Sequence, residues 1–203
     1  LGWNYLRANG AVGTSGIQTL YSGTIANKCV STTKDFTYCL PNVQSSLEAG
    51  GSASAWVGGA YNGTTAVKTD TNFGFDMAYP EDVGLTGGVS YAALRVWAFD
   101  GTTLHQSPWV RGPVANPATA SISYLLHWDA SAEMLSLIQV GLVNGQAMPA
   151  CSVFADGMAG KTVKDRSCGL MVENTSTGNN FIRQNDPAWI QFAPATRIEP
   201  WRA

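Results

Sequence analysis

The feature that most constrains the fold is a series of short segments in which apolar and small polar residues alternate, with turn signals between them. A period of two is the pattern of a half-buried strand, and Asn-Gly or Asp-Gly between two such segments signals a hairpin. The strand-like segments are 17–25, 53–57, 90–99, 121–128, 135–142, 169–173 and 189–192. Turn signals lie at 9–10, 62–63, 100–101, 144–145 and 177–178. The sequence therefore predicts an all-β protein.

Helical periodicity is nearly absent, and the best helical candidate, residues 130–138, also fits a strand. A chain of 203 residues can bury one sizeable core. We therefore expect a single domain, residues 1–203, built as a two-sheet antiparallel β-sandwich. Three prolines within 108–117 predict a rigid crossing between the two sheets.

The composition excludes several functions. Charged residues make up only 13% of the chain, the formal net charge is -2, and no basic cluster suggests a nucleic-acid partner. No apolar run approaches the length of a membrane span. Neither a phosphate-binding loop nor a G-x-S-x-G elbow is present, and no cofactor is predicted.

The four cysteines fall into two local groups, which predict the disulfides Cys29–Cys39 and Cys151–Cys168. A zinc site is the weaker alternative, because there is no C-x2-C pair. Disulfides indicate an oxidising compartment, so we expect a secreted, processed chain. Glycosylation sequons at residues 62–64 and 174–176 add slight support.

Two features could carry chemistry on general grounds. His127 and Asp129 would share one face of a strand, as part of a base relay or metal site or simply as a surface pair, which is the favoured reading. The chain also has seven tryptophans, which could stack on sugar rings or fill a β-sandwich core. Trp109, beside prolines in the crossing segment, is the one most expected to be exposed.

Several short motifs resemble the secreted glutamic peptidases, or eqolisins. They occur in the family's order: SAWVG at 54–58, NFGFDM at 72–77, SYAALRVW at 90–97, VENTSTG at 172–178 and PAWI at 187–190. The resemblance implies a concanavalin-like jelly roll with a concave groove that binds an extended polypeptide. It also implies that Trp56 and Trp189 lie in strands at one concave face.

The resemblance further implies a glutamate as general acid and base, and a glutamine that holds the oxyanion. The glutamine position falls on Asn72, and the glutamate position falls on Ala188, which cannot transfer a proton. Asp186 is the nearest substitute, and an acid endopeptidase activity is therefore doubtful. The residues expected to bind substrate are Trp56, Asp76, Trp97, Trp109 and Trp189.

Two alternatives remain open at this point. A lectin-like module or adhesin would bind a glycan through exposed Trp and Tyr side chains. A glycan-cleaving enzyme on the same sandwich would need two facing carboxylates. An aromatic strip without a carboxyl–amide pair or facing carboxylates would favour the lectin.

Overall fold

The computed structural model describes residues 4–9, 14–21, 29–57, 72–113, 122–141, 146–158, 160–164, 168–174, 179–184 and 189–192. Side-chain burial is described for residues 32–56, 72–113, 122–141, 146–158 and 160–161, and for Val172 and Asn180. No helix among the described residues is long and apolar enough to cross a membrane.

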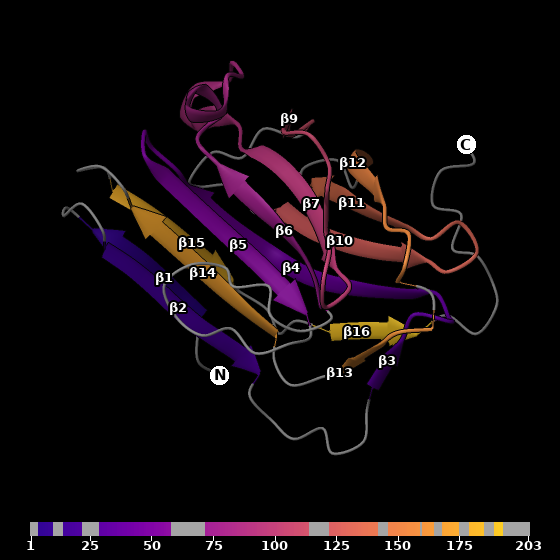
Figure 1. Ribbon diagram of the computed structural model, residues 1–203. Coiled ribbons are helices and arrows are strands. Elements are labelled where there is room, and N and C mark those ends of the chain that lie inside the picture. Colours follow the sequence, from indigo (N-terminus) through magenta and orange to yellow (C-terminus); the bar gives the residue numbers. More distant parts are fainter. Residues whose placement is uncertain are drawn as a thin grey trace.

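The fold is a sandwich of two antiparallel sheets (Figure 1). The first, sheet A, has the order β1 (Asn4–Asn9), β15 (Asn179–Gln184), β4 (Phe36–Ser46), β10 (Ile122–Asp129), β11 (Met134–Gly141) and β12 (Ala147–Phe154), with β16 (Trp189–Phe192) also paired to β4. The second, sheet B, has the order β2 (Thr14–Tyr21), β14 (Cys168–Asn174), β5 (Gly51–Val57), β6 (Asn72–Ala78), β7 (Ala93–Phe99) and β8 (Leu104–Gln106), with β9 (Val110–Arg111) also paired to β7.

Three smaller elements complete the described structure. Strands β3 (Cys29–Ser31) and β13 (Thr162–Lys164) form a separate two-stranded sheet. Two 3-10 turns, η1 (Pro80–Val83) and η2 (Gly88–Ser90), lie between β6 and β7. The segment 130–138, which fitted a helix or a strand, is a turn followed by β11, so the strand reading is correct.

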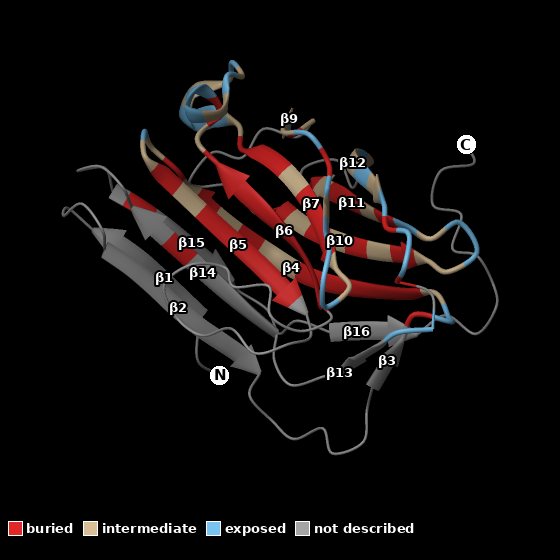
Figure 2. Ribbon diagram, viewed as in Figure 1, coloured by how far each residue is buried: buried red, intermediate tan, exposed pale blue. Residues whose placement is uncertain are grey.

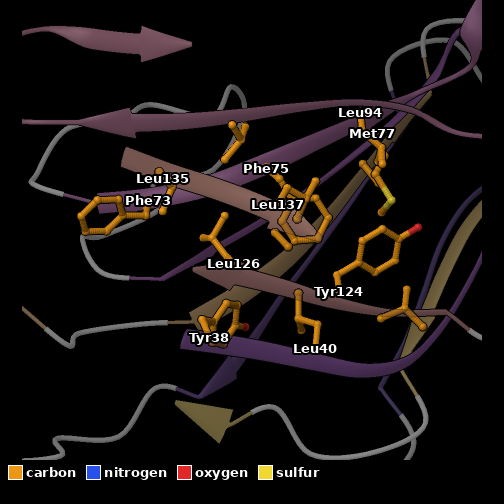
Figure 3. Close-up of a cluster of buried hydrophobic side chains, with 14 of the residues drawn as sticks. Tyr38, Leu40, Phe73, Phe75, Met77, Leu94, Tyr124, Leu126, Leu135 and Leu137 are labelled. Carbon is orange, nitrogen blue, oxygen red and sulfur yellow. The ribbon is translucent and has the colours of Figure 1, made fainter. Parts of the chain in front are cut away.

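The core lies between the two sheets and is rich in aromatic residues. Buried and less buried positions alternate along several strands (Figure 2), and the close-up in Figure 3 shows the side chains that meet between the sheets. Phe75 of sheet B stacks on Tyr124 of sheet A with ring centroids 5.1 Å apart. Phe73 of sheet B contacts Trp128 of sheet A in a tilted arrangement, with ring centroids 5.5 Å apart. Trp128 is fully buried, and its indole N–H donates to the carbonyl of Thr32 at 3.0 Å.

The two predicted disulfides are not present, because Cys39 and Cys151 are both free thiols. Strand pairing explains the error. Cys29 pairs with Lys164 in the small sheet, whereas Cys39 pairs with Leu125 in sheet A. Similarly, Cys151 lies in sheet A and Cys168 begins β14 in sheet B. Neighbours in sequence are thus carried into different sheets, and the secreted location stays a prediction.

We expect Cys39 to be an unreactive thiol in the folded protein. Its residue is 4% exposed, and burial raises the pKa of the thiol to about 11, so almost no reactive thiolate forms at neutral pH. A thiol reagent should therefore leave Cys39 unlabelled in the folded protein. It should label Cys39 once the protein is unfolded, even when no reductant has been added. Peptide mapping of the labelled protein checks this. A Cys29–Cys39 cross-linked peptide would contradict the structure.

Candidate functional site

The outer face of sheet B carries the polar and aromatic residues that the sequence pointed to. Along β5, β6 and β7, one set of alternating side chains enters the core and includes Phe73, Phe75 and Val96. The other set lies on the opposite face of the sheet, because successive strand residues point to opposite sides. This outer set comprises Ser54, Trp56, Asn72, Gly74, Asp76, Arg95 and Trp97.

Asp76 is the centre of this outer face. Strand register places it directly between Ser54 on β5 and Arg95 on β7. One carboxylate oxygen accepts hydrogen bonds from Ser54 Oγ and Trp97 Nε1, both at 2.9 Å. The other accepts from Nε and Nη2 of Arg95, at 3.0 and 2.7 Å. A carboxylate with both oxygens engaged in this way is a fixed structural anion, and it orients Arg95 and Trp97.

Gly74 makes room for Trp97. It lies opposite Trp97 in the register, and a Cβ added to Gly74 would be 2.2 Å from Cζ2 of the indole and 2.5 Å from the carbonyl oxygen of Ala55. The ring therefore lies directly on the glycine. Trp56, opposite Gly74 on β5, is also buried on this side of the sheet. Trp56 and Trp97 are thus part of a packed outer layer.

A β-bulge at the sheet edge positions Trp109. Gln106 of β8 pairs with Trp97 and Val110 of β9 pairs with Leu94, so residues 107–109 oppose only residues 95–96. Pro108 has no amide hydrogen to donate to the neighbouring strand. Here the Val96 N–H donates to the Ser107 side chain, with its nitrogen 3.1 Å from Oγ. An extra residue in one strand re-aims the next side chain.

Two arginine–aromatic contacts lie near this edge of sheet B, one made by Arg95 and the other by Arg111. Trp109 is half-buried, and the Arg95 guanidinium carbon lies 4.4 Å from its ring centroid. The guanidinium carbon of exposed Arg111 lies 4.7 Å from the Tyr91 ring centroid. Arg111 pairs with Ala93, two residues from both Tyr91 and Arg95. We refer to Tyr91, Arg95, Trp109 and Arg111 as the arginine–aromatic ladder.

Most other described carboxylates hold loops rather than face one another. They accept backbone N–H groups: Asp35 from Ala130, Glu81 from Gly87 and Gly88, Asp82 from Gly50, Asp100 from Thr102 and Thr103, and Asp129 from Ser131 and Ala132. The bond from Thr103 lowers the pKa of Asp100. Burial acts to raise the pKa of Asp129, but its hydrogen bonds outweigh burial and lower it.

These carboxylates do not form a metal centre in the described part of the chain. There, no three His, Cys, Asp or Glu side chains gather as they would around a cation. His127, the earlier metal or relay candidate, has its Nδ1 3.0 Å from the hydroxyl of Thr37 on the outer face of sheet A. The surface-pair reading of His127 and Asp129 therefore fits best.

Of the predicted catalytic pair, only Asn72 lies among the described residues. Asn72 is 4% exposed, and its Oδ1 has no hydrogen-bond partner among the described residues. Asp186 lies outside those residues. Trp56 and Trp189 both lie in strands, as predicted, but in different sheets, because β16 pairs with β4 of sheet A. The motif alignment that placed both at one face is therefore wrong.

Of the predicted substrate-binding residues, Trp56, Asp76, Trp97 and Trp109 do come together on sheet B. Trp109 has the expected partial exposure, whereas Trp56, Trp97 and Trp128 are buried. Sequence reasoning missed Arg95 and Arg111. The signal was present for Arg95, a charged residue at an alternating position two before Trp97 in a strand-like run.

Comparison with known proteins confirms the fold class and corrects the resemblance. No protein-family model matches the sequence, and neither does any curated protein. Solved structures match over most of the chain, among them the legume lectin-like domain from Entamoeba histolytica, with a TM-score of 0.51, 12% identity, and coverage of 93% of this chain and 84% of that one.

Two further similar structures are carbohydrate-binding domains of the same architecture. The exoplasmic/lumenal domain of VIP36, in a Ca2+/Man3GlcNAc-bound form, has a TM-score of 0.53 and 9% identity, covering 98% of this chain and 86% of that one. The carbohydrate recognition domain of Emp46p, in a potassium-bound form, has a TM-score of 0.53 and 12% identity, covering 89% and 85%. These neighbours point to a legume-lectin-like sandwich and not to the glutamic peptidase family, so that resemblance and the peptide-binding function drawn from it do not hold.

Proposed function

We propose that the protein is a glycan-binding module of the lectin type, and that the arginine–aromatic ladder is its sugar-contacting surface. The observation that carries the proposal is Trp109, a half-buried indole on a rigid sheet edge with Arg95 held against it. Aromatic rings stack on the apolar faces of sugars, and guanidinium groups donate to their hydroxyls. Similar structures bound to mannose-containing ligands support the choice of carbohydrate.

The ladder is preorganised, which lowers the entropy lost on binding. The Asp76 carboxylate fixes Arg95 by two hydrogen bonds, and the Ser107 bulge fixes the path of the chain on either side of Trp109. Exposed Gln106 extends the polar surface along β8, in register with Trp97. A ligand would therefore meet a ring and planar polar groups that are already in place.

Two of the similar structures hold Ca2+ or potassium, but the donor set for such an ion is not assembled in the described residues. Calcium prefers six to eight oxygen ligands, several from carboxylates. Here the Asp76 oxygens are taken by Ser54, Trp97 and Arg95. The proposal therefore uses side-chain contacts alone.

We expect Trp109→Ala to weaken glycan binding at least about 30-fold, the effect of losing about 2 kcal/mol from a central aromatic contact. Trp109→Phe should retain part of the affinity, since a ring remains. The measurement is a glycan array, followed by calorimetry on the strongest ligand. Thermal unfolding of each variant checks that the fold is intact.

The matched control is Phe154→Ala. Phe154 is a 62% exposed aromatic residue at the end of β12 in sheet A, so its removal takes away a surface ring outside the ladder. We expect its glycan affinity to equal that of the unaltered protein. Equal losses in both variants, or full binding by Trp109→Ala, would contradict the proposed site.

A further inference from the structure

Among the side chains that the structure describes, few are cationic, and half of these lie on the ladder. The described side chains include only four from Lys or Arg: Lys34, Arg95, Arg111 and Lys161. Two of the four lie on the ladder, with each guanidinium against an aromatic ring. Arginine is better suited than lysine to bidentate recognition of a planar anion. The placement therefore suggests that a negative group is bound here.

Arg95, one of these two arginines, shows how a guanidinium on the ladder can bind a carboxylate. Arg95 lies against Trp109 and presents its Nε and Nη2 atoms to one oxygen of Asp76, at 3.0 and 2.7 Å. Its charge is thus compensated within the protein. Only 26% of the Arg95 side chain is exposed, so the pair is partly shielded from solvent.

Arg111 has the same aromatic support but lacks this compensation. It is exposed, and no carboxylate among the described residues lies within ion-pair distance of its guanidinium. The acidic groups of the neighbouring turn are engaged elsewhere, since Glu81 accepts the N–H groups of Gly87 and Gly88 and Asp82 accepts that of Gly50. The stem of Arg111 packs near Gly87 beside Tyr91. The Arg111 guanidinium is therefore held against an aromatic ring, is exposed to solvent, and has no carboxylate of the described residues as an ion-pair partner.

We infer that Arg111 and Tyr91 form a subsite for the carboxylate of an acidic sugar of the uronic acid type. The inference rests on the proposed glycan-binding function and adds the class of sugar. Trp109 and Arg111 are two residues apart on one edge, a rise of about 7 Å along a strand. A sugar ring that lies on Trp109 can thus direct its carboxylate to Arg111, in the manner of Asp76 to Arg95.

The test compares acidic sugars with neutral counterparts, and oligogalacturonate and its methyl ester are the closest pair. The probes are oligogalacturonate and its methyl ester, together with sialyllactose, sulfated lactose and lactose. We expect oligogalacturonate to bind about 10- to 100-fold more tightly than its methyl ester, the range for a charge-assisted hydrogen-bonded pair at a partly exposed site. The preference should shrink as salt is added. Tight binding of sulfated lactose with weak binding of both carboxylate sugars would overturn the uronate assignment.

The variants separate this inference from the proposed function. Arg111→Gln should abolish the preference for the acid over its ester, so that the two ligands bind with about equal affinity. Lys34→Gln removes the same charge from an exposed turn outside the ladder, and it should keep the full preference. If neutral and acidic probes bind equally and only Trp109→Ala reduces binding, the acidic subsite is wrong and the glycan site stands. If none of these probes binds but the glycan array yields a ligand that needs Trp109, the acidic subsite is wrong and the glycan site stands. If the array yields no ligand either, both are wrong.

Discussion

Gly74→Ala should destabilise the protein by about 3 kcal/mol or more, at the upper end of the range for overpacking. The new methyl group would lie 2.2 Å from the Trp97 indole and 2.5 Å from the carbonyl oxygen of Ala55. The indole cannot easily move, because its Nε1 is bonded to Asp76. The carbonyl belongs to the adjacent strand, so relief would require the two strands to separate. For a chain of this size, the melting temperature should fall by roughly 6–12 °C.

Gly84→Ala is the matched control for this prediction. Gly84 has a φ of +77°, and a Cβ added there meets nothing within 4 Å. Its replacement therefore adds only the backbone strain of a left-handed alanine, about 1 kcal/mol. Denaturant unfolding of both variants measures the difference. Equal losses would show that Trp97 does not lie tightly on Gly74.

The local alternation predicted several strands well, because a sheet with one buried face imposes it directly on the sequence, but it did not mark β4, β12 or β15. Residues 53–57, 121–128 and 135–142 match β5, β10 and β11 closely. The crossing predicted for 108–117 is also correct, since the chain passes from β9 in sheet B to β10 in sheet A. Each of these features depends on residues near one another in sequence.

Strand pairing was less predictable, since it depends on distant residues. The turn signals at 62–63, 100–101 and 144–145 do separate strands that pair with each other. Those at 9–10 and 177–178 separate strands of different sheets, because β1 and β15 pair in sheet A while β2 and β14 pair in sheet B. The same kind of turn signal thus stands before a strand of the same sheet in one case and of the other sheet in the other, and tertiary packing decides between them.

The site was also predicted only in part, because the local strand pattern places some of its residues and distant contacts place the others. Trp56, Asp76 and Trp97 occupy alternating positions of neighbouring strands, so their common face followed from the sequence pattern once those strands paired. The position of Trp109 depends on a bulge, which the sequence pattern did not predict. The peptidase alignment failed because short motifs such as PAWI carry no information about the sheet that they join.

Asp76→Ala should cost about 3–5 kcal/mol, the range for removing one partner of a buried charged pair. The carboxylate accepts four hydrogen bonds, and its loss leaves Trp97 Nε1, Ser54 Oγ and the Arg95 guanidinium without that acceptor. Ser54 and Trp97 are buried, so water cannot easily replace it. Asp76→Asn should cost less, because the amide oxygen can still accept. Urea unfolding of the two variants measures both losses.

A double-mutant cycle separates the ion pair from the rest of the network. Arg95→Ala alone removes the salt bridge and leaves Asp76 bonded to Ser54 and Trp97. In the Asp76→Ala background the carboxylate is already gone, so the same substitution removes a cation that has lost this partner. We therefore expect Arg95→Ala to cost clearly less in that background, with a coupling energy of about 1–3 kcal/mol. Glycan affinity should fall in every variant that frees or removes Arg95, because Trp109 then loses its support. Additive losses in stability, with unchanged binding, would mean that Asp76 neither holds Arg95 nor organises the ladder.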